Sequence, residues 1–154
     1  MRMIDMLVEK ARIECEGWAR NRTLPHMWDE CPRGDWLISM ARKIASLDSF
    51  KWVEVARQCA DHVAYLRLIE MSAGASAAAS SGAASDAFHA STVSAAVEYA
   101  LCASVHSAAA CAAHAAAAAA TYPQAVEDSI VAAEEEQRWQ ADMIRSLIPN
   151  PFKS

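Results

Sequence analysis

The chain has 154 residues, a length at which one domain buries about 70% of the surface that its unfolded chain exposes. Its 14 Lys and Arg residues against 19 Asp and Glu residues give a net charge of -5, which argues against a protein that binds nucleic acid by neutralising phosphates. Alanine supplies 35 residues, and there are only four glycines and five prolines. Because alanine is the best helix former, we expect an all-α fold: a single-domain bundle over residues 1–154, with about five to six helices and close-packed alanine-rich helices at its centre.

Apolar residues recur at helical spacing between residues 4 and 19, and charged residues occupy the other side. This amphipathic pattern predicts the first helix. Residues 21–34 contain two prolines and a glycine and show no apolar period, so we expect a loop there.

Two further charged helices are predicted before the alanine-rich part. Asp35 stands at an N-cap position, where its carboxylate can accept bonds from the free amides of a short helix over 36–47. Asp48 and Ser49 form a second capping pair, before a third helix that runs to about Leu68.

Residues 71–120 form a neutral alanine-rich segment in which only Asp86 and Glu98 carry a formal charge. An alanine face lets two helix axes approach at the short end of the usual range of about 8 to 10 Å. Such a face can pack within the chain or against a second copy, so a homodimer through these helices is one possible assembly. The larger residues of the flanking helices then supply the core, with four tryptophans as anchors: Trp18, Trp36, Trp52 and Trp139.

The neutral segment is expected to break into separate helices. Residues 80–82, Ser-Ser-Gly, are the first predicted break, because glycine costs a helix about 1 kcal/mol relative to alanine and serine competes for backbone partners. An unbroken helix over 85–120 would be about 54 Å long, whereas a domain of this size has a radius of gyration near ~15 Å. We therefore expect another break at 91–92, Ser-Thr, with 104–107 as the next choice.

The uncharged stretch 100–121 raises the question of a membrane span. It is mainly alanine and lacks the Leu, Ile, Phe and Val content that drives insertion, so we expect no membrane contact. The first ten residues lack the apolar run of a signal peptide. The five cysteines are an odd number without a Cys-x-x-Cys pair, which indicates a cytoplasmic protein with free thiols.

The last helix is predicted to start at Pro123, with Glu127 and Asp128 in its first turn, where the helix dipole favours acids. Its apolar stripe is interrupted at Gln137 and Gln140. Two prolines near residue 150 end it, and the phenylalanine between them and the C-terminus is expected to fold back on the bundle.

An acidic run, Glu134 to Glu136, lies within this last helix. Its two open interpretations are a solvated face and a contact patch for a basic partner. Glu134 and Arg138 are four residues apart and can pair on the outer face.

Three Cys and His pairs have a spacing compatible with metal ligation from a helix. Thiols are, however, also common as small core hydrophobes, and the chain lacks a tight zinc-finger pattern or a base and nucleophile motif. We therefore expect no metal, no cofactor and no enzymatic activity, and a metal protein or enzyme remains the alternative. The pairs are Cys59 with His62, Cys102 with His106, and Cys111 with His114.

Residues 31–37, CPRGDWL, are the most distinctive stretch of the chain. Proline fixes φ, glycine permits a tight approach and tryptophan anchors the start of a helix, which leaves Cys31 and Arg33 without a structural explanation. This stretch resembles the signature that opens a helix in an alanine-rich immunity protein family, found beside toxin genes in bacterial polymorphic toxin systems. The uncharged alanine tract and the C-terminal LIPNPF at 147–152 are similar to that family as well.

The resemblance implies a small cytoplasmic helical protein that neutralises a toxin by stoichiometric binding, without catalytic residues. A phage-encoded inhibitor of a bacterial defence complex would work by the same physics, and a self-assembling helical protein is the structural alternative. The candidate contact residues come from the two polar segments singled out above: Arg33, Asp35, Glu134, Glu135, Glu136 and Arg138.

Overall fold

A computed structural model describes residues 3–41, 49–68, 71–118 and 125–153. These residues form seven α-helices and one short 3-10 helix, with no strand among them, so the predicted all-α bundle is confirmed with one more helix than expected. The elements in chain order are α1 (Met3–Ala19), α2 (Leu24–Glu30), α3 (Gly34–Ala41), α4 (Ser49–Val63), the 3-10 helix η1 (Ala64–Leu68), α5 (Met71–Phe88), α6 (Val93–Ala118) and α7 (Ala125–Leu147).

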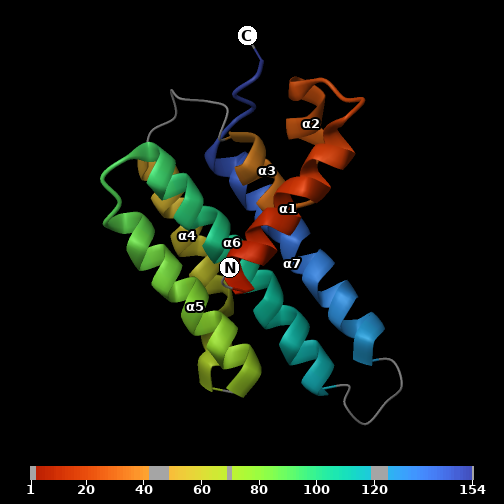
Figure 1. Ribbon diagram of the computed structural model, residues 1–154, viewed down its shortest axis with the longest axis vertical. Helices are drawn as coiled ribbons and strands as arrows, with labels where there is room; N and C mark the ends of the chain where they lie inside the picture. The colour runs from red at the N-terminus through yellow and green to blue at the C-terminus, as the bar shows by residue number, and fades with distance from the viewer. Residues whose placement is uncertain (1–2, 42–48, 69–70, 119–124, 154) are drawn as a thin grey trace.

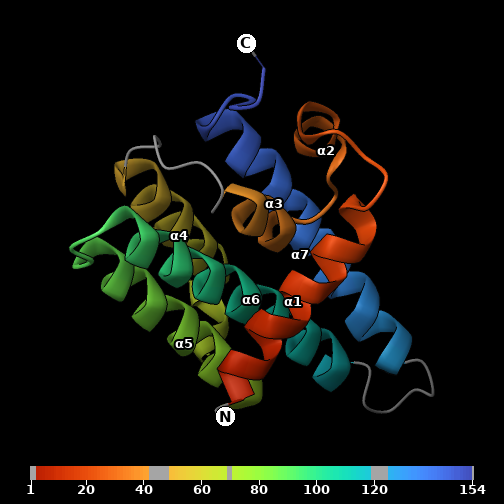
Figure 2. The same ribbon diagram turned by 45° about the horizontal axis from the view of Figure 1, so that its top comes forward.

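Helix α6 is the centre of the bundle, and it packs against α4, α5 and α7 (Figure 1). Apart from Val97 and Leu101, the buried residues of α6 are all alanine or serine. Small side chains of this kind let helix axes approach closely, so the centre is the close-packed alanine-rich layer that the composition predicts. Helix α1 crosses the outside of the bundle on the side of α3 and α6 (Figure 2).

By length and composition alone, α6 could also cross a membrane. Of its most apolar window, 39% is buried inside the bundle, where three helices surround it.

The predicted break at 80–82 is wrong, because α5 runs through it without interruption. Ser80 is buried, and its hydroxyl donates to the carbonyl of Ala103 in α6 over 2.9 Å. The serine therefore bonds a neighbouring helix instead of competing for the backbone of its own helix.

The break at 91–92 is confirmed, since α5 ends at Phe88 and α6 begins at Val93. The hydroxyl oxygen of Thr92 accepts a 3.1 Å bond from the backbone N–H of Ala95, which makes Thr92 the N-cap of α6. Helix α6 then continues through 104–107 to Ala118, so the second choice of break is not used.

The loop predicted over 21–34 is wrong, because it contains helix α2. Pro25 lies in the first turn of α2, where a missing N–H costs no hydrogen bond. The helix buries Met27 and Trp28, and the indole of Trp28 donates to the carbonyl of Ile148 over 3.2 Å. Phe152 packs edge-on against Trp28 with ring centroids 6.0 Å apart, so the tail folds back as predicted.

The other predicted boundaries agree with the structure where it describes them. Helix α4 and η1 together reach Leu68, and α7 ends at Leu147, ahead of Pro149, with its acidic first turn in place. The end of the predicted helix over 36–47, the cap at Asp48 and the start of the last helix at Pro123 lie outside the described residues.

Helices α3 and α7 come very close together at Gly34. A Cβ atom on Gly34 would lie 2.4 Å from the Cβ of Gln140, a distance that real side chains do not adopt. No glycine in the described ranges has a positive φ, so space, and not backbone conformation, requires glycine at this position.

We expect Gly34→Ala to lower the free energy of unfolding by about 1 to 3 kcal/mol, because α3 and α7 must separate to admit the methyl group. Gly82→Ala is the matched control: a Cβ there meets nothing within 4 Å, so helix propensity should stabilise the protein by up to about 1 kcal/mol. Urea denaturation measures both changes. Equal effects of the two substitutions would contradict the close approach at Gly34.

Candidate functional site

Arg33 links helix α1 to the start of helix α3. Its guanidinium donates to both oxygens of Asp35, over 3.0 and 2.6 Å, and to Oε2 of Glu14 in α1 over 2.8 Å. It also lies 4.5 Å above the ring of Trp36. Burial works against the charged form, but the hydrogen bonds that Arg33 donates to Asp35 and Glu14, together with the charges of those carboxylates, outweigh it and raise the pKa of Arg33. Arg33 thus acts as a structural clamp.

The predicted N-cap role of Asp35 is wrong. The backbone N–H of Leu37 donates to the carbonyl of Arg33 over 3.2 Å, which makes Arg33 the N-cap residue and places Asp35 inside the first turn. The carboxylate of Asp35 is 3% exposed and bonds Arg33. Because it is buried, a partner that binds the folded chain does not reach it directly.

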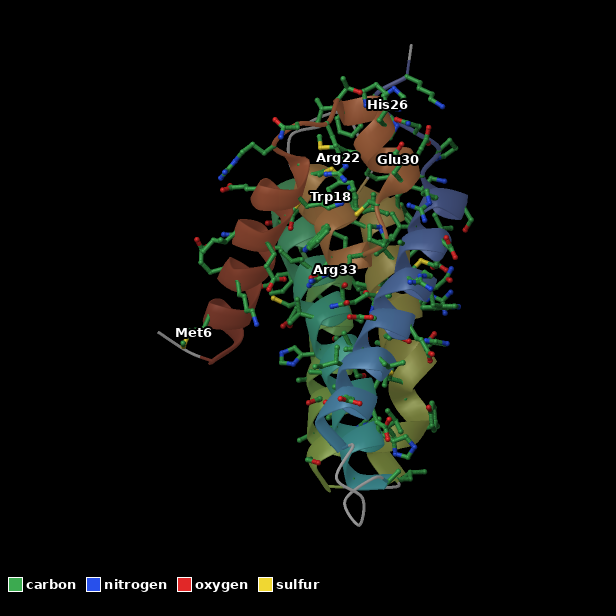
Figure 3. The ribbon with its side chains drawn as sticks, turned by 90° about the vertical axis from the view of Figure 1, so that its right-hand side faces the viewer. Met6, Trp18, Arg22, His26, Glu30 and Arg33 are labelled. Atoms are coloured by element: carbon green, nitrogen blue, oxygen red, sulfur yellow. The ribbon has the colours of Figure 1, made fainter. Side chains whose placement is uncertain are left out.

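An aromatic stack extends from this clamp to the surface. The rings of Trp36 and Trp18 are 5.6 Å apart, and the guanidinium of Arg22 lies 4.4 Å over Trp18. Figure 3 shows Trp18, Arg22 and Arg33 close together, with Met6 at the far end of α1. The stack fixes the C-terminal half of α1 against α3.

A polar cluster joins α6 and α7 inside the bundle. Gln140 is fully buried; its side-chain carbonyl accepts a 2.5 Å bond from the hydroxyl of Ser104, and its amide donates to the carbonyl of Ser104 over 3.2 Å. One helix turn away, the hydroxyl of Ser107 donates to the carbonyl of Cys59 in α4 over 2.7 Å. Ser80 of α5 lies 2.8 Å from that hydroxyl, so bonds of this cluster reach all four central helices.

The acidic run Glu134 to Glu136 is divided between two sides of α7. Successive residues of a helix are about 100° apart, and here Glu134 and Glu135 are exposed whereas Glu136 is 4% exposed. Glu136 therefore does not belong to a surface patch, which corrects its predicted contact role. Arg138 is exposed, and among the described residues it does not form the ion pair with Glu134 that the spacing allows.

Glu136 is held by three side chains from three helices. His62 of α4 donates from Nδ1 to Oε2 of Glu136 over 2.7 Å, and the amide of Gln140 lies 3.4 Å from Oε1. The thiol of Cys111 in α6 is a further hydrogen-bond partner. The ring of His62 stacks on Trp139 at 3.6 Å and 9° from parallel.

All of these residues except Gln140 border an open cavity of about 270 Å³ between α4, η1, α6 and α7. It brings together members of two of the Cys and His pairs, whereas Cys59 is buried elsewhere in the core. Within the described part of the chain, no three His, Cys, Asp or Glu side chains are arranged to hold a metal ion. Its wall includes His62, Tyr65, Cys111, His114, Glu136 and Trp139.

The thiols near these sites are poor nucleophiles. Burial raises the pKa of Cys31 and of Cys111 to about 12, and for Cys111 the charge and hydrogen bond of Glu136 add to the effect. The pKa of Cys59 is also raised, first by burial and then by the charge of Glu136. The thiolate is the reactive form, so these side chains are unreactive near neutral pH.

A larger cavity of about 690 Å³ lies beneath α1, between α2, α3 and α6. Its wall contains Cys15, Met27 and Met40, all buried, together with Arg12. The guanidinium of Arg12 donates to both carboxylate oxygens of Glu98, over 3.0 and 2.7 Å. Arg12 thus fastens α1 to α6, and the exposed Glu16 and Arg20 are the other charged residues of this wall.

Sequence analysis did not identify His62, Trp139 and Gln140 as members of one site. The sequence feature that pointed to this site is the interruption of the apolar stripe at Gln140. A polar residue that faces the core needs a buried hydrogen-bond partner. His62 is 74 residues away from Glu136, and no pattern of spacing connects the two.

Comparison with known proteins does not assign a function. No protein-family model matches the chain, and neither a curated protein nor a solved structure is significantly similar to it.

The ion pair between Arg33 and the buried Asp35 predicts that the two residues are energetically coupled. Arg33→Met should cost more than Asp35→Asn, because it leaves the buried carboxylate without its cation. A double-mutant cycle in urea should give a coupling energy of about 1 to 3 kcal/mol. If Asp35 acted only as a cap, the two substitutions would add without coupling.

Glu136→Gln should lower the pKa of Cys111, since the substitution removes a neighbouring negative charge. The rate of alkylation of Cys111 by iodoacetamide at pH 8 should therefore rise, followed by peptide mass spectrometry. Cys31 is the internal control, because Glu136 does not contribute to its pKa. Equal acceleration at both thiols would indicate general loosening of the fold instead.

Proposed function

We propose that the chain is a non-enzymatic inhibitor that binds a bacterial toxin or effector stoichiometrically, in the manner of an immunity protein. The observation that carries the proposal is the outer face of α7, an exposed acidic surface that includes two apolar residues in its N-terminal half. The proposal follows the expectation that the resemblance of residues 31–37 to the immunity protein signature implies.

The acidic face of α7 covers about four turns of the helix. Glu127, Val131, Glu134, Arg138 and Asp142 follow one another at spacings of four and three residues, which places them in one row. Three more exposed residues flank this row. The full face is Glu127, Asp128, Ile130, Val131, Glu134, Glu135, Arg138 and Asp142.

The composition of this face fits a basic protein partner. Five carboxylates and Arg138 share this face, and Asp142 among them pairs with Arg145 over 2.9 Å. The remaining excess of negative charge steers an oppositely charged protein and raises its association rate. Ile130 and Val131 are 52% and 50% exposed, which gives a partner apolar area to bury. In Figure 3, α7 lies in front of the bundle and no other helix covers its outer side.

The rest of the fold suits a rigid binding surface. Hydrogen bonds of Gln140 and Glu136 fix the inner side of α7 to its neighbours. These bonds oppose rotation of the helix about its axis, so the outer side chains keep one orientation. A preformed surface loses less conformational entropy on binding than a mobile one. Such a protein would act in the cytoplasm, where its partner is made or delivered.

Two alternatives use other properties of the chain. An inhibitor of a bacterial defence complex, encoded by a phage, would use the same face and differ only in its partner. A self-assembling protein would use small side chains; α5 and α6 already pack theirs against each other, which leaves the outer side of α5, with Ala75 and Ala78 exposed, for a second copy.

Affinity capture of the tagged protein at moderate salt, from its host or from cells expressing its neighbouring genes, should yield one stoichiometric basic partner. The double variant Glu134→Lys/Glu135→Lys should weaken capture at least about tenfold, because it places like charges across the interface. The control, Glu30→Lys/Asp86→Lys, changes net charge equally at exposed sites on α2 and α5 and should bind normally.

Two results would contradict the proposal. Recovery of the chain alone, as a stable dimer or larger assembly, would favour self-assembly. Equal losses with both double variants would show that net charge matters and that the acidic face of α7 does not.

A further inference from the structure

The polar contacts that attach helix α2 to the bundle come from residues 145–153. Helix α2 is not among the described helices that pack extensively on one another. Figures 1 and 2 show it at the same end of the molecule as the C-terminal tail. Between described residues, each side-chain hydrogen bond or ion pair that joins α2 to a distant part of the chain involves a residue of 145–153.

Asn150 is the centre of these contacts. Its side-chain amide donates to the carbonyl of Pro25 over 2.8 Å and to Oδ1 of Asp29 over 3.1 Å. Its side-chain carbonyl accepts a 3.0 Å bond from the backbone N–H of Phe152, a local turn of the kind that asparagine favours. This turn places the ring of Phe152 edge-on against Trp28. Asn150 therefore bonds α2 and also positions the tail.

Two further contacts strengthen this attachment. The indole N–H of Trp28 donates to the carbonyl of Ile148 over 3.2 Å, and Nζ of Lys153 lies 2.7 Å from Oδ2 of Asp29. Trp28 and Ile148 are both buried, so removal of apolar surface from water adds to the bonds. We call residues 148–153 the C-terminal latch.

Arg145 of α7 holds the C-terminal end of α2. Its guanidinium donates to the carbonyls of Trp28 and Cys31 over 3.2 and 2.7 Å. Because Arg145 belongs to a long helix of the bundle, this attachment does not depend on the latch. It is a fixed point about which α2 can move.

Helix α2 needs these contacts because it is short. It has seven residues, whereas isolated helices of fewer than about 12 residues are marginal in water. Parts of a protein with few packing contacts open locally at a lower free energy than the whole fold. Without the latch, we expect α2 to detach while the rest of the bundle stays folded.

Helix α2 forms part of the wall of the larger cavity beneath α1. Leu24 and Met27 line this cavity of about 690 Å³ from α2, and Cys15 lines it from α1. Cys15 is only 5% exposed. Movement of α2 out of the wall widens the cavity and exposes Cys15 to solvent.

We propose that the C-terminal latch controls access to the larger cavity: when it releases Pro25 and Asp29, α2 moves away from the bundle about its attachment to Arg145, and the cavity opens. The latch is separate from the outer face of α7, so this inference goes beyond the proposed function and does not depend on it. Any change that displaces residues 150–153 from α2 therefore also opens the cavity.

Native-state hydrogen exchange of the full chain, followed by mass spectrometry, tests the first step. Asn150→Ala removes three hydrogen bonds of the latch and should speed exchange of the amides of 24–30 at least about tenfold, because the net contributions of these bonds add up to such a factor. Phe152→Ala removes the ring contact with Trp28 and should act in the same direction. Exchange in α4 and α6 should remain unchanged.

Alkylation of Cys15 by iodoacetamide tests the second step. Its rate in Asn150→Ala should rise at least about tenfold, since reaction of a buried group follows the population of the open form. Alkylation of Cys59, which is buried in the central core, should stay the same. Matched controls outside the latch are Asn21→Ala and Phe88→Ala, both at exposed sites, and they should change neither rate.

Three results would overturn the proposal. Unchanged exchange of 24–30 in both latch variants would show that the latch does not hold α2. Equal acceleration in α2, α4 and α6 would show that the tail stabilises the whole fold and not a separate unit. Faster exchange of α2 with unchanged alkylation of Cys15 would show that movement of α2 does not open the cavity.

Discussion

The structure depends on the burial of one polar side chain, that of Gln140. Three helices meet around it: α3 approaches so closely that only a glycine fits at position 34, and α6 exchanges two hydrogen bonds with it through Ser104. A buried amide costs free energy unless its donors and acceptor are bonded, so the position of α6 relative to α7 is fixed by more than apolar contact. Alanine-rich helices need a buried, hydrogen-bonded side chain of this kind. Methyl groups alone present a smooth surface, which does little to select one packing register between two helices.

Fixing the inner side of α7 has a direct consequence for its outer side. Glu136 and Gln140 point inward, and helical geometry then points Glu134, Arg138 and their neighbours outward. The same helix therefore holds the bundle together and carries the proposed binding face. The CPRGDWL segment belongs to the inner side of this arrangement: Gly34 permits the approach of α3 to α7, while Arg33 bonds Asp35 and Glu14 of α1. In this chain the distinctive motif stabilises the scaffold, and the proposed binding face lies on α7.

Much of the fold could be predicted from the sequence, and the failures have physical causes. The cap at Thr92 and the end of α7 follow from local chemistry, which spacing reveals. Helix α2 was missed because its seven residues make fewer than two turns, too few for an apolar period to show. The break predicted at Ser80 failed because that hydroxyl bonds α6, a contact that depends on tertiary packing. The site could be predicted only in part. Three successive glutamates cannot share one side of a helix, so one of them turns inward. Its partner His62 could not be identified, because it lies 74 residues away in the sequence.

The central claim is that the outer face of α7 binds a basic partner while its inner face serves the fold. Carboxylate footprinting tests this most directly, by labelling exposed acids with a carbodiimide and an amine in the free chain and in the captured complex. The account predicts that Glu127, Asp128, Glu134 and Glu135 are labelled in the free chain and protected in the complex, whereas Glu30 and Asp86 are labelled equally in both. Protection of Glu30 with unchanged labelling of Glu134 and Glu135 would place the interface on α2 and contradict the account.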